Sequence, residues 1–318
     1  MSTTQETEPR AEGASAVAGG RGRVAVTGAT GMVGTALVPA LEKGGYTVVR
    51  VVRGKPDQRR GDVRWDPSTG LLDPSALDGV TAVVHLASEN IGQRWSSAAK
   101  RRIRESRIKG TRLIATTIAH LDHPPRVFLS VSAVGFYGDT GDREVNEESP
   151  PGTDFLASVA TEWEAATEPA TGESVRVVIT RFGPILSPNG GVLQKLLPPF
   201  RLGLGGRAGA GTQWVSWVAL DDAVRAIVFA IRNDALRGTF NVVAPNPVTN
   251  AELAHTLGHV LHRPTVASVP ASAFKLALGE MATVALLAGQ RVSSAKLQAA
   301  GFEFLHPKLE EALRFELR

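Results

Sequence analysis

The chain has 318 residues, of which 43% are hydrophobic and 21% are charged, as in an ordinary globular protein with one large or two unequal domains. It contains no cysteine, which excludes disulfides, thiolate zinc sites and cysteine nucleophiles. No apolar run of about 18 residues is present, and the polar, partly acidic N-terminus does not look like a secretory signal. We therefore expect a cytoplasmic protein with no membrane partner.

The formal net charge of +4 raises the alternative of a nucleic-acid partner. Lysine and arginine are scattered, and the one dense run, residues 100–104, fits the exposed face of a helix. We expect no nucleic-acid partner. The sequence carries no signal for the oligomeric state.

The first elements in chain order predict a strand–helix–strand unit. Residues 1–22 are too poor in apolar side chains to join a core, so we expect a disordered tail. A strand is expected at residues 24–27, followed by a glycine-rich turn, a helix at 35–43 and a second strand at 46–52.

Further apolar runs without strict alternation predict parallel strands that are buried on both faces. They lie at residues 82–86, 127–131, 175–179 and 239–243, and helices are expected at 98–121, 155–168 and 218–231. This alternation predicts an α/β fold with a Rossmann-type doubly wound parallel sheet. We assign residues 23–185 and 215–245 to this dinucleotide-binding domain. The Gly/Pro-rich residues 186–214 and residues 246–318 are expected to form a smaller, discontinuous substrate lobe.

The turn after the first strand carries three glycines, Gly28, Gly31 and Gly34, at intervals of three. In this context the first permits a tight turn, the second allows the backbone to approach a pyrophosphate, and the third allows close helix packing. The N-terminus of the following helix favours an anion. We expect Gly28, Thr30, Gly31, Met32 and Val33 to bind a dinucleotide.

The second strand ends in Val52, Arg53 and Gly54, with no acidic residue before Asp57. An acidic residue here would bind the ribose 2′-hydroxyl of NAD, whereas an arginine can pair with a 2′-phosphate. The sequence therefore predicts NADP(H) as the cofactor and Arg53 as its selectivity residue. The alternative is a solvated arginine at the end of a strand.

With these residues in place, the chain resembles the short-chain dehydrogenase/reductase superfamily. Within it, the chain resembles an atypical branch, the SDR39U-like proteins, which are described as NAD-dependent epimerase/dehydratase-like proteins of unknown substrate. The resemblance runs from Val24 to about Leu317. The segments that carry it include residues 86–91, Arg94-Trp95, residues 105–107, 132–138, 155–157, Trp163-Glu164, residues 181–183, Gly205-Gly206, Gln213, Trp217, Ala244-Pro245, Asn250 and Gly301-Phe302.

The resemblance implies further cofactor contacts. Leu86 and Ala87 would line the ribose and nicotinamide side of the cofactor, and Glu89, two residues further on, would also contact the cofactor. Arg107, on the next helix, would reach a cofactor phosphate. Arg181 and the residues after it, about Ile185, would flank the nicotinamide.

Most members of the superfamily use a serine or threonine, a tyrosine, and a lysine four residues after that tyrosine. Ser132 matches the serine. Phe155 and Val159 stand where the tyrosine and the lysine are expected, and neither side chain can move a proton. Tyr137 could instead act as the acid, or it could be a buried tyrosine with a hydrogen-bonded hydroxyl.

Glu89 is a candidate base, with the alternative that it binds backbone or ribose hydroxyls. Asp154, Glu162 and Glu164 are expected to be solvated or capping groups. His255 and His259 are four residues apart but have no third ligand nearby in sequence, so we infer no metal.

Two functions remain open. The first is an NADP(H)-dependent oxidoreductase or epimerase-like enzyme that acts on a small carbonyl or hydroxyl compound. The second is a non-catalytic NADPH-binding sensor or regulatory protein, which the residues at positions 155 and 159 favour. The sequence does not identify the substrate.

Overall fold

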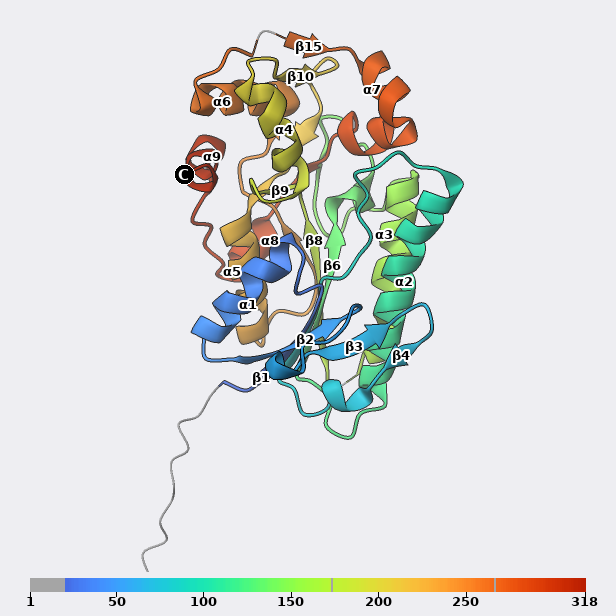
Figure 1. Cartoon of the computed structure of the whole chain (residues 1–318). Helices are drawn as coiled ribbons and strands as arrows, with labels where there is room; N and C mark the ends of the chain where they lie inside the picture. The colour runs from blue at the N-terminus through green and yellow to red at the C-terminus, as the bar shows by residue number, and fades with distance from the viewer. Residues whose placement is uncertain (1–20, 173, 266) are drawn as a thin grey trace, which may run out of the picture.

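A large parallel sheet forms the centre of the computed structural model, which describes residues 21–172, 174–265 and 267–318. Eight strands lie in the order β13-β8-β6-β5-β1-β2-β3-β4 (Figure 1). The predicted fold class is confirmed. The predicted tail, residues 1–22, lies almost wholly outside the described residues. Among the described residues, no helix combines the length and the apolarity needed to cross a membrane.

The strands of this sheet run parallel except for the last pair, β3 and β4. Their bounds are β1 Arg23–Thr27, β2 Thr47–Val52, β3 Val63–Asp66, β4 Leu71–Leu72, β5 Ala82–His85, β6 Val127–Ala133, β8 Arg176–Phe182 and β13 Gly238–Val242. From β1 the chain adds β2 and β3 on one side, then crosses to β5 on the other side. The edge beyond the ends of β1 and β5 is therefore the switch point where such sheets bind ligands.

Helices cover both faces of the sheet. Helices α1 (Met32–Lys43) and α5 (Leu220–Arg232) lie on one side, and α2 (Ser97–Ala119) and α3 (Phe155–Ala165) lie on the other (Figure 1). Successive strand residues alternate between two cores, with Val24 and Val26 on the α1 side and Ala25 on the α2 side. Burial on both faces explains the unbroken apolar runs of these strands.

A smaller lobe lies beyond the carboxyl ends of the strands (Figure 1). Its core joins separate stretches of the chain, including Leu193, Trp217, Leu257 and Leu313. Its helices are α4 Gly191–Arg201, α6 Asn250–Leu261, α7 Ala271–Leu278 and α9 Leu309–Glu316, and its short strands are β9 Ile185–Leu186, β10 Gly206–Ala208, β11 Trp214–Val215, β12 Val218–Ala219, β14 Val248–Thr249 and β15 Ala267–Val269.

Two features differ from the prediction. Strands β3 and β4 were not expected, because β3 alternates apolar with charged residues and β4 is only two residues long, so neither gives a clear apolar run. Part of the predicted lobe instead packs on the sheet, since Leu297 in α8 (Ala295–Ala299) and Phe302 belong to the core beneath α1 and α5. The remaining strands, β7 (Glu144–Val145) and β16 (Arg291–Val292), pair with each other.

Gly34→Ala should destabilise the fold, because a Cβ at this position would lie 2.6 Å from Ala29 Cα, inside the turn that joins β1 to α1. Overpacking of this kind typically lowers the free energy of unfolding by about 1–3 kcal/mol. Gly172→Ala is the matched control, since a Cβ there meets no atom within 4 Å. Denaturant unfolding measures both variants, and equal stability of the two would contradict the prediction.

Candidate functional site

The glycine turn lies between β1 and the chain that leaves β5. Gly28 has a φ of +69°, and a Cβ there would lie 2.9 Å from the amide nitrogen of Ala87, so both conformation and space require glycine. Gly31 is the N-cap of α1. Thr30 and Gly31 are exposed, while Met32 and Val33 are half-buried. The turn therefore presents exposed backbone at a helix N-terminus, which fits a pyrophosphate.

Arg53 borders a cavity of about 230 Å³ at the ends of β2, β3 and β5. Its other lining residues include Trp65, Ser68, Ala87, Glu89, Arg102, Ser106 and Lys109. Arg102 contacts Glu89 at 3.7 Å and Lys109 contacts Glu105 at 3.4 Å, whereas Arg53 has no ion pair or side-chain hydrogen bond to any described residue. Its guanidinium is therefore available to an anionic ligand.

The backbone of Leu86 and Ala87 is held by a side chain of the neighbouring strand. Both amides donate to Thr27 Oγ1, at 3.1 and 3.3 Å, and that oxygen lies 2.7 Å from His85 Nδ1. Thr27 and His85 are fully buried. Burial lowers the pKa of His85 to about 4, so the ring is neutral at physiological pH.

The loop from residue 86 to residue 96 connects this edge of the sheet to the lobe. Lys195 of α4 donates to the carbonyl of Gly92 at 2.6 Å, and Arg94 donates to the carbonyls of Leu276 and Ala277 at the end of α7. Trp95 packs in an apolar cluster with Met281. The loop thus contacts the lobe through both α4 and α7.

Arg107 supports the same loop from α2. Its guanidinium donates to the carbonyls of Glu89 at 3.0 Å and Ile103 at 3.1 Å, and it lies over the ring of Trp163. Burial lowers the pKa of Arg107 to about 10, although Glu89 opposes this shift. The guanidinium of Arg107 therefore supports the loop. Its predicted contact with a cofactor phosphate stays a prediction.

A buried polar network surrounds the end of β6. Ser132 Oγ donates to Glu164 Oε1 at 2.6 Å, and Arg181 donates to both oxygens of Glu164 at 2.8 and 2.7 Å. Arg181 also donates to Tyr137 Oη at 2.9 Å, and that hydroxyl donates to Asn241 at 2.8 Å. Five elements, namely β6, the helical turn at residues 134–137, α3, β8 and β13, therefore meet in one chain of hydrogen bonds.

The hydrogen bonds of this network distinguish the two roles considered for Tyr137, which are a proton-donating acid and a buried tyrosine with a hydrogen-bonded hydroxyl. The side chain is 2% exposed, and its oxygen both accepts and donates a hydrogen bond within the protein. Burial raises the pKa of Tyr137, although Arg181 opposes this. The geometry favours a buried, hydrogen-bonded tyrosine over an acid. Arg181 likewise has its donors turned toward Glu164 and Tyr137, so the predicted nicotinamide contact of Arg181 is not supported by these bonds.

The acidic residues do not all lie where we expected. Asp154 caps α3 through a bond from the Ala157 amide, and Glu162 pairs with Arg104, in agreement with the expectation. The expectation for Glu164 was wrong, because its side chain is 11% exposed and paired with Arg181. Glu89 lies on the cavity beside Arg53, which favours its role at the adenosine end over that of a base.

Helix α3 carries the two substituted positions. The Phe155 ring packs against Trp95 with centroids 5.1 Å apart, and Lys100 lies 4.6 Å above the Phe155 ring. Val159 is buried. Ile185 pairs with Val218 through β9 and β12 and packs on the core beneath α1. A contact of Ile185 with nicotinamide stays a prediction.

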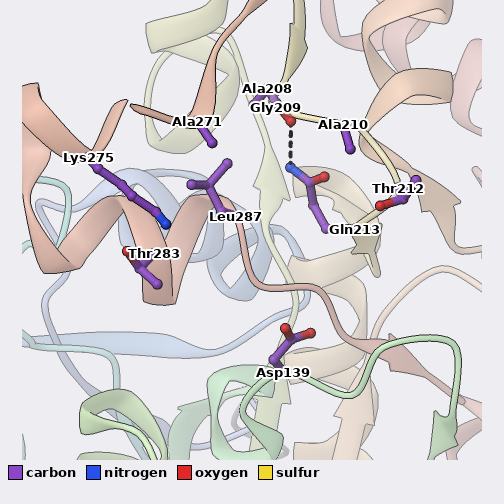
Figure 2. Close-up of a pocket in the computed structure, with 10 residues that line it drawn as sticks. All are labelled: Asp139, Ala208, Gly209, Ala210, Thr212, Gln213, Ala271, Lys275, Thr283 and Leu287. Carbon is purple, nitrogen blue, oxygen red and sulfur yellow. Dashed lines mark hydrogen bonds between the residues drawn. The ribbon is translucent and has the colours of Figure 1, made fainter. Parts of the chain in front are cut away.

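A second cavity, of about 330 Å³, is lined mainly by residues of the lobe (Figure 2). Lys275, Thr283 and Leu287 line one side, Thr212 and Gln213 line the other, and Asp139 lies below them. The Gln213 amide nitrogen donates to the carbonyls of Ala208 and Leu286, and its oxygen accepts no hydrogen bond from any residue that the structure describes. This cavity suits a small polar molecule rather than the dinucleotide.

Sequence reasoning missed Thr27, His85, Glu164 and Asn241 as members of the site. Glu164 had a usable signal, because it lies four residues after Ala160 and seven after Ala157 on the buried face of α3. The others had none, because their partners are 58 residues away, for Thr27 and His85, or 104 residues away, for Asn241 and Tyr137.

Arg53→Ala should weaken NADPH binding by about 10- to 100-fold, since a hydrogen bond to a charged group contributes about 1.5–3 kcal/mol. NADH lacks the 2′-phosphate, so its affinity should change little. Titration with each dinucleotide measures the difference. Arg314→Ala, on α9, controls for the loss of one positive charge, and an equal loss of NADPH and NADH affinity in Arg53→Ala would remove the assignment.

Burial of His85 predicts a pH dependence of stability. The unfolded chain takes up a proton at His85 as the pH falls through 6.5, whereas the folded protein resists this until about pH 4. The free energy of unfolding should therefore fall toward low pH in this window, by at most about 1.4 kcal/mol per pH unit from this group. His85→Asn should show a shallower loss in denaturant unfolding across the window. Parallel pH profiles would refute the assignment.

The comparisons with known proteins agree with this geometry. The NAD dependent epimerase/dehydratase family model matches residues 24–243, and a domain of unknown function (DUF1731) matches residues 269–316. Epimerase family protein Mb2239 of Mycobacterium bovis is 44% identical over 293 residues, which cover 92% of this chain and 96% of that protein. Human epimerase family protein SDR39U1 is 36% identical over 296 residues, covering 92% and 98%.

The crystal structure of human SDR39U1 (isoform2) with NADPH superposes with a TM-score of 0.85 and 34% identity, covering 92% of this chain and 98% of that chain. These matches confirm the resemblance inferred from the sequence motifs. The family match spans more than half of the chain, and the relatives exceed 30% identity over most of its length. The chain therefore belongs to the NAD dependent epimerase/dehydratase family.

Proposed function

We propose that the chain binds NADP(H) and acts as an oxidoreductase or epimerase-like enzyme on a small hydroxyl or carbonyl compound. The glycine turn offers exposed backbone at the N-terminus of α1, and Arg53, beside the end of β2, offers a guanidinium that pairs with no described residue. The human relative crystallised with NADPH supports the same cofactor. Such a ligand would run along the adjacent ends of β2, β1 and β5 toward β6.

The observation that carries the enzymatic proposal is the bond from Ser132 to Glu164. When bound, NADP(H) would supply or accept a hydride at the nicotinamide. Ser132 stands at the end of β6, the strand next to β5, and its own proton is directed at a carboxylate. Its oxygen keeps lone pairs as acceptors, so in a complex it would accept from a substrate hydroxyl rather than bind a carbonyl, although Ser132 is 3% exposed in this structure.

Glu164 would accept a proton from Ser132, and Arg181 would hold Glu164 in place for this transfer. If a substrate hydroxyl donates to Ser132 Oγ, the serine proton can pass to Glu164 Oε1 as the substrate O–H bond breaks. Arg181 holds the carboxylate with two hydrogen bonds and keeps it aimed at the serine. The remainder of the substrate would occupy the polar cavity between Lys275 and Gln213.

The alternative is a non-catalytic NADPH-binding sensor, and specific contacts favour it. Phe155 is packed on Trp95 and Val159 is buried, so α3 brings neither a phenol nor an ammonium to the site. Tyr137 has both hydrogen bonds of its hydroxyl satisfied inside the protein. In this reading, the Ser132–Glu164–Arg181 network would serve stability alone.

A turnover assay separates the two functions. NADP+ reduction and NADPH oxidation are followed by absorbance with a panel of small alcohols, aldehydes and ketones. If the enzyme proposal holds, Ser132→Ala should lower turnover by about 10²-fold or more, as removal of a proton-transfer group does, with NADPH affinity unchanged. Tyr137→Phe is the control and should retain turnover. NADPH binding without turnover on any compound would favour the sensor.

A further inference from the structure

Thr27 and His85 form a buried pair at the switch point of the sheet, and neither side chain contacts solvent. Thr27 ends β1 and His85 ends β5, and the two residues are register partners in adjacent parallel strands. The inference drawn from them rests on the proposed binding of NADP(H).

A hydrogen-bond count fixes the direction of the bond between them. Thr27 Oγ1 accepts from the amides of Leu86 and Ala87, which uses both lone pairs of the hydroxyl. The remaining hydroxyl proton must therefore be donated to His85 Nδ1, 2.7 Å away. Only a neutral ring with its proton on Nε2 can accept this bond, and burial keeps the ring neutral.

Leu86 and Ala87 need to be placed accurately. The space above Gly28 is filled by their backbone, with Leu86 C at 3.0 Å and Ala87 N at 2.9 Å from a Cβ built on that glycine. A shift of either peptide would therefore change the width of the opening between the glycine turn and β5. Ala87 also lines the cavity beside Arg53, so the same peptides border the proposed adenosine end.

The His85 ring is also held by residues that pack against it. Its ring meets Trp65 edge to face, with centroids 5.7 Å apart, and lies against Gly110 of α2, where a Cβ would be 3.5 Å from the ring. Its Nε2 has no hydrogen-bond partner among the described residues. An unpaired buried N–H lowers stability, so this histidine is retained at a cost in folding free energy.

We propose that His85 is a positioning residue for the cofactor: through the Thr27 hydroxyl, its Nδ1 holds the Leu86 and Ala87 peptides in the conformation that NADP(H) requires. Loss of the acceptor at position 85 frees the hydroxyl to rotate. In part of the population the Ala87 amide then loses this acceptor, and the Leu86 amide keeps only its bond to the Thr27 carbonyl, at 3.3 Å. Only the molecules that keep the binding conformation can bind the cofactor. The apparent affinity for the cofactor therefore falls in proportion to their fraction.

The test measures the dissociation constant of NADPH by cofactor fluorescence on folded full-length variants. His85→Phe keeps a ring but removes the acceptor, and it should weaken binding about fivefold, the equivalent of one hydrogen bond. His85→Asn places an amide oxygen near the position of Nδ1 and should restore most of the affinity. Thr27→Val should match His85→Phe, whereas Thr27→Ser should bind as the wild type does.

Ser130→Ala is the matched control. Ser130 is the register partner of His85 in β6, is 1% exposed and has no hydrogen-bond partner among the described residues. Its truncation should leave the dissociation constant unchanged. In the double variant His85→Phe/Thr27→Val, the loss should not exceed that of Thr27→Val alone, because both changes remove one coupled unit.

Amide hydrogen exchange without cofactor gives a second readout. Leu86 and Ala87 should exchange faster in His85→Phe than in the wild type, and as slowly as the wild type in Ser130→Ala. Wild-type affinity in His85→Phe, a weakening of equal size in Ser130→Ala, or additive losses in the double variant would each overturn the proposal. Failure of the wild type to bind NADPH would instead overturn the proposed function. If His85→Phe does not fold, Thr27→Val and His85→Asn are compared instead. Thr27→Val should weaken NADPH binding, and His85→Asn should retain most of the affinity.

Discussion

The architecture of the site depends on one steric constraint, the close approach of the turn after β1 to the chain leaving β5. At Gly28 the backbone of Ala87 occupies the place of a side chain, and the positive φ excludes most other residues as well. Gly34 lets α1 start directly above this turn. The amides in the first turn of α1, after Gly31, can face a ligand only because these two contacts are made without side chains.

The polar side chains around Ser132, at the end of β6, are buried and paired with one another. The Arg181–Glu164 ion pair is joined by Ser132, Tyr137 and Asn241, so each charge has hydrogen bonds beyond its partner. Such an arrangement is needed, because an isolated buried charge is far more costly than a paired one. The network also explains why the end of β6 can hold a serine hydroxyl in a single orientation.

Local signals could be read from the sequence, and long-range partners could not. The glycine turn was recognisable because the strand before it, the three spaced glycines and the helix after it all lie within residues 23–43. Arg53 was recognisable from its place at a strand end. By contrast, Glu164 was expected in solvent although its spacing from Ala157 and Ala160 indicates the buried face of the helix, and its partner Arg181 could not be inferred from residues near it in sequence.

The same limit applies to the roles inferred for individual residues. The phenol of Tyr137 was visible in the sequence, but its bond to Asn241 depends on β6 and β13 flanking β8 in the finished sheet. The weak pattern of β3 hid Trp65, which both packs on His85 and lines the cavity beside Arg53. Residue chemistry could be inferred from the sequence, whereas solvent access and pairing required the fold.

The loop of residues 86–96 has a thermodynamic consequence for the molecule as a whole. It borders the glycine turn through Ala87, and it reaches α4 through Gly92 and α7 through Arg94. If a ligand at the sheet edge restricts this segment, these contacts would restrict the lobe as well, and a ligand in the lobe would restrict the sheet edge in turn. Linkage requires the two effects on affinity to be equal in size, so occupancy of either cavity can be read from the binding isotherm of the other.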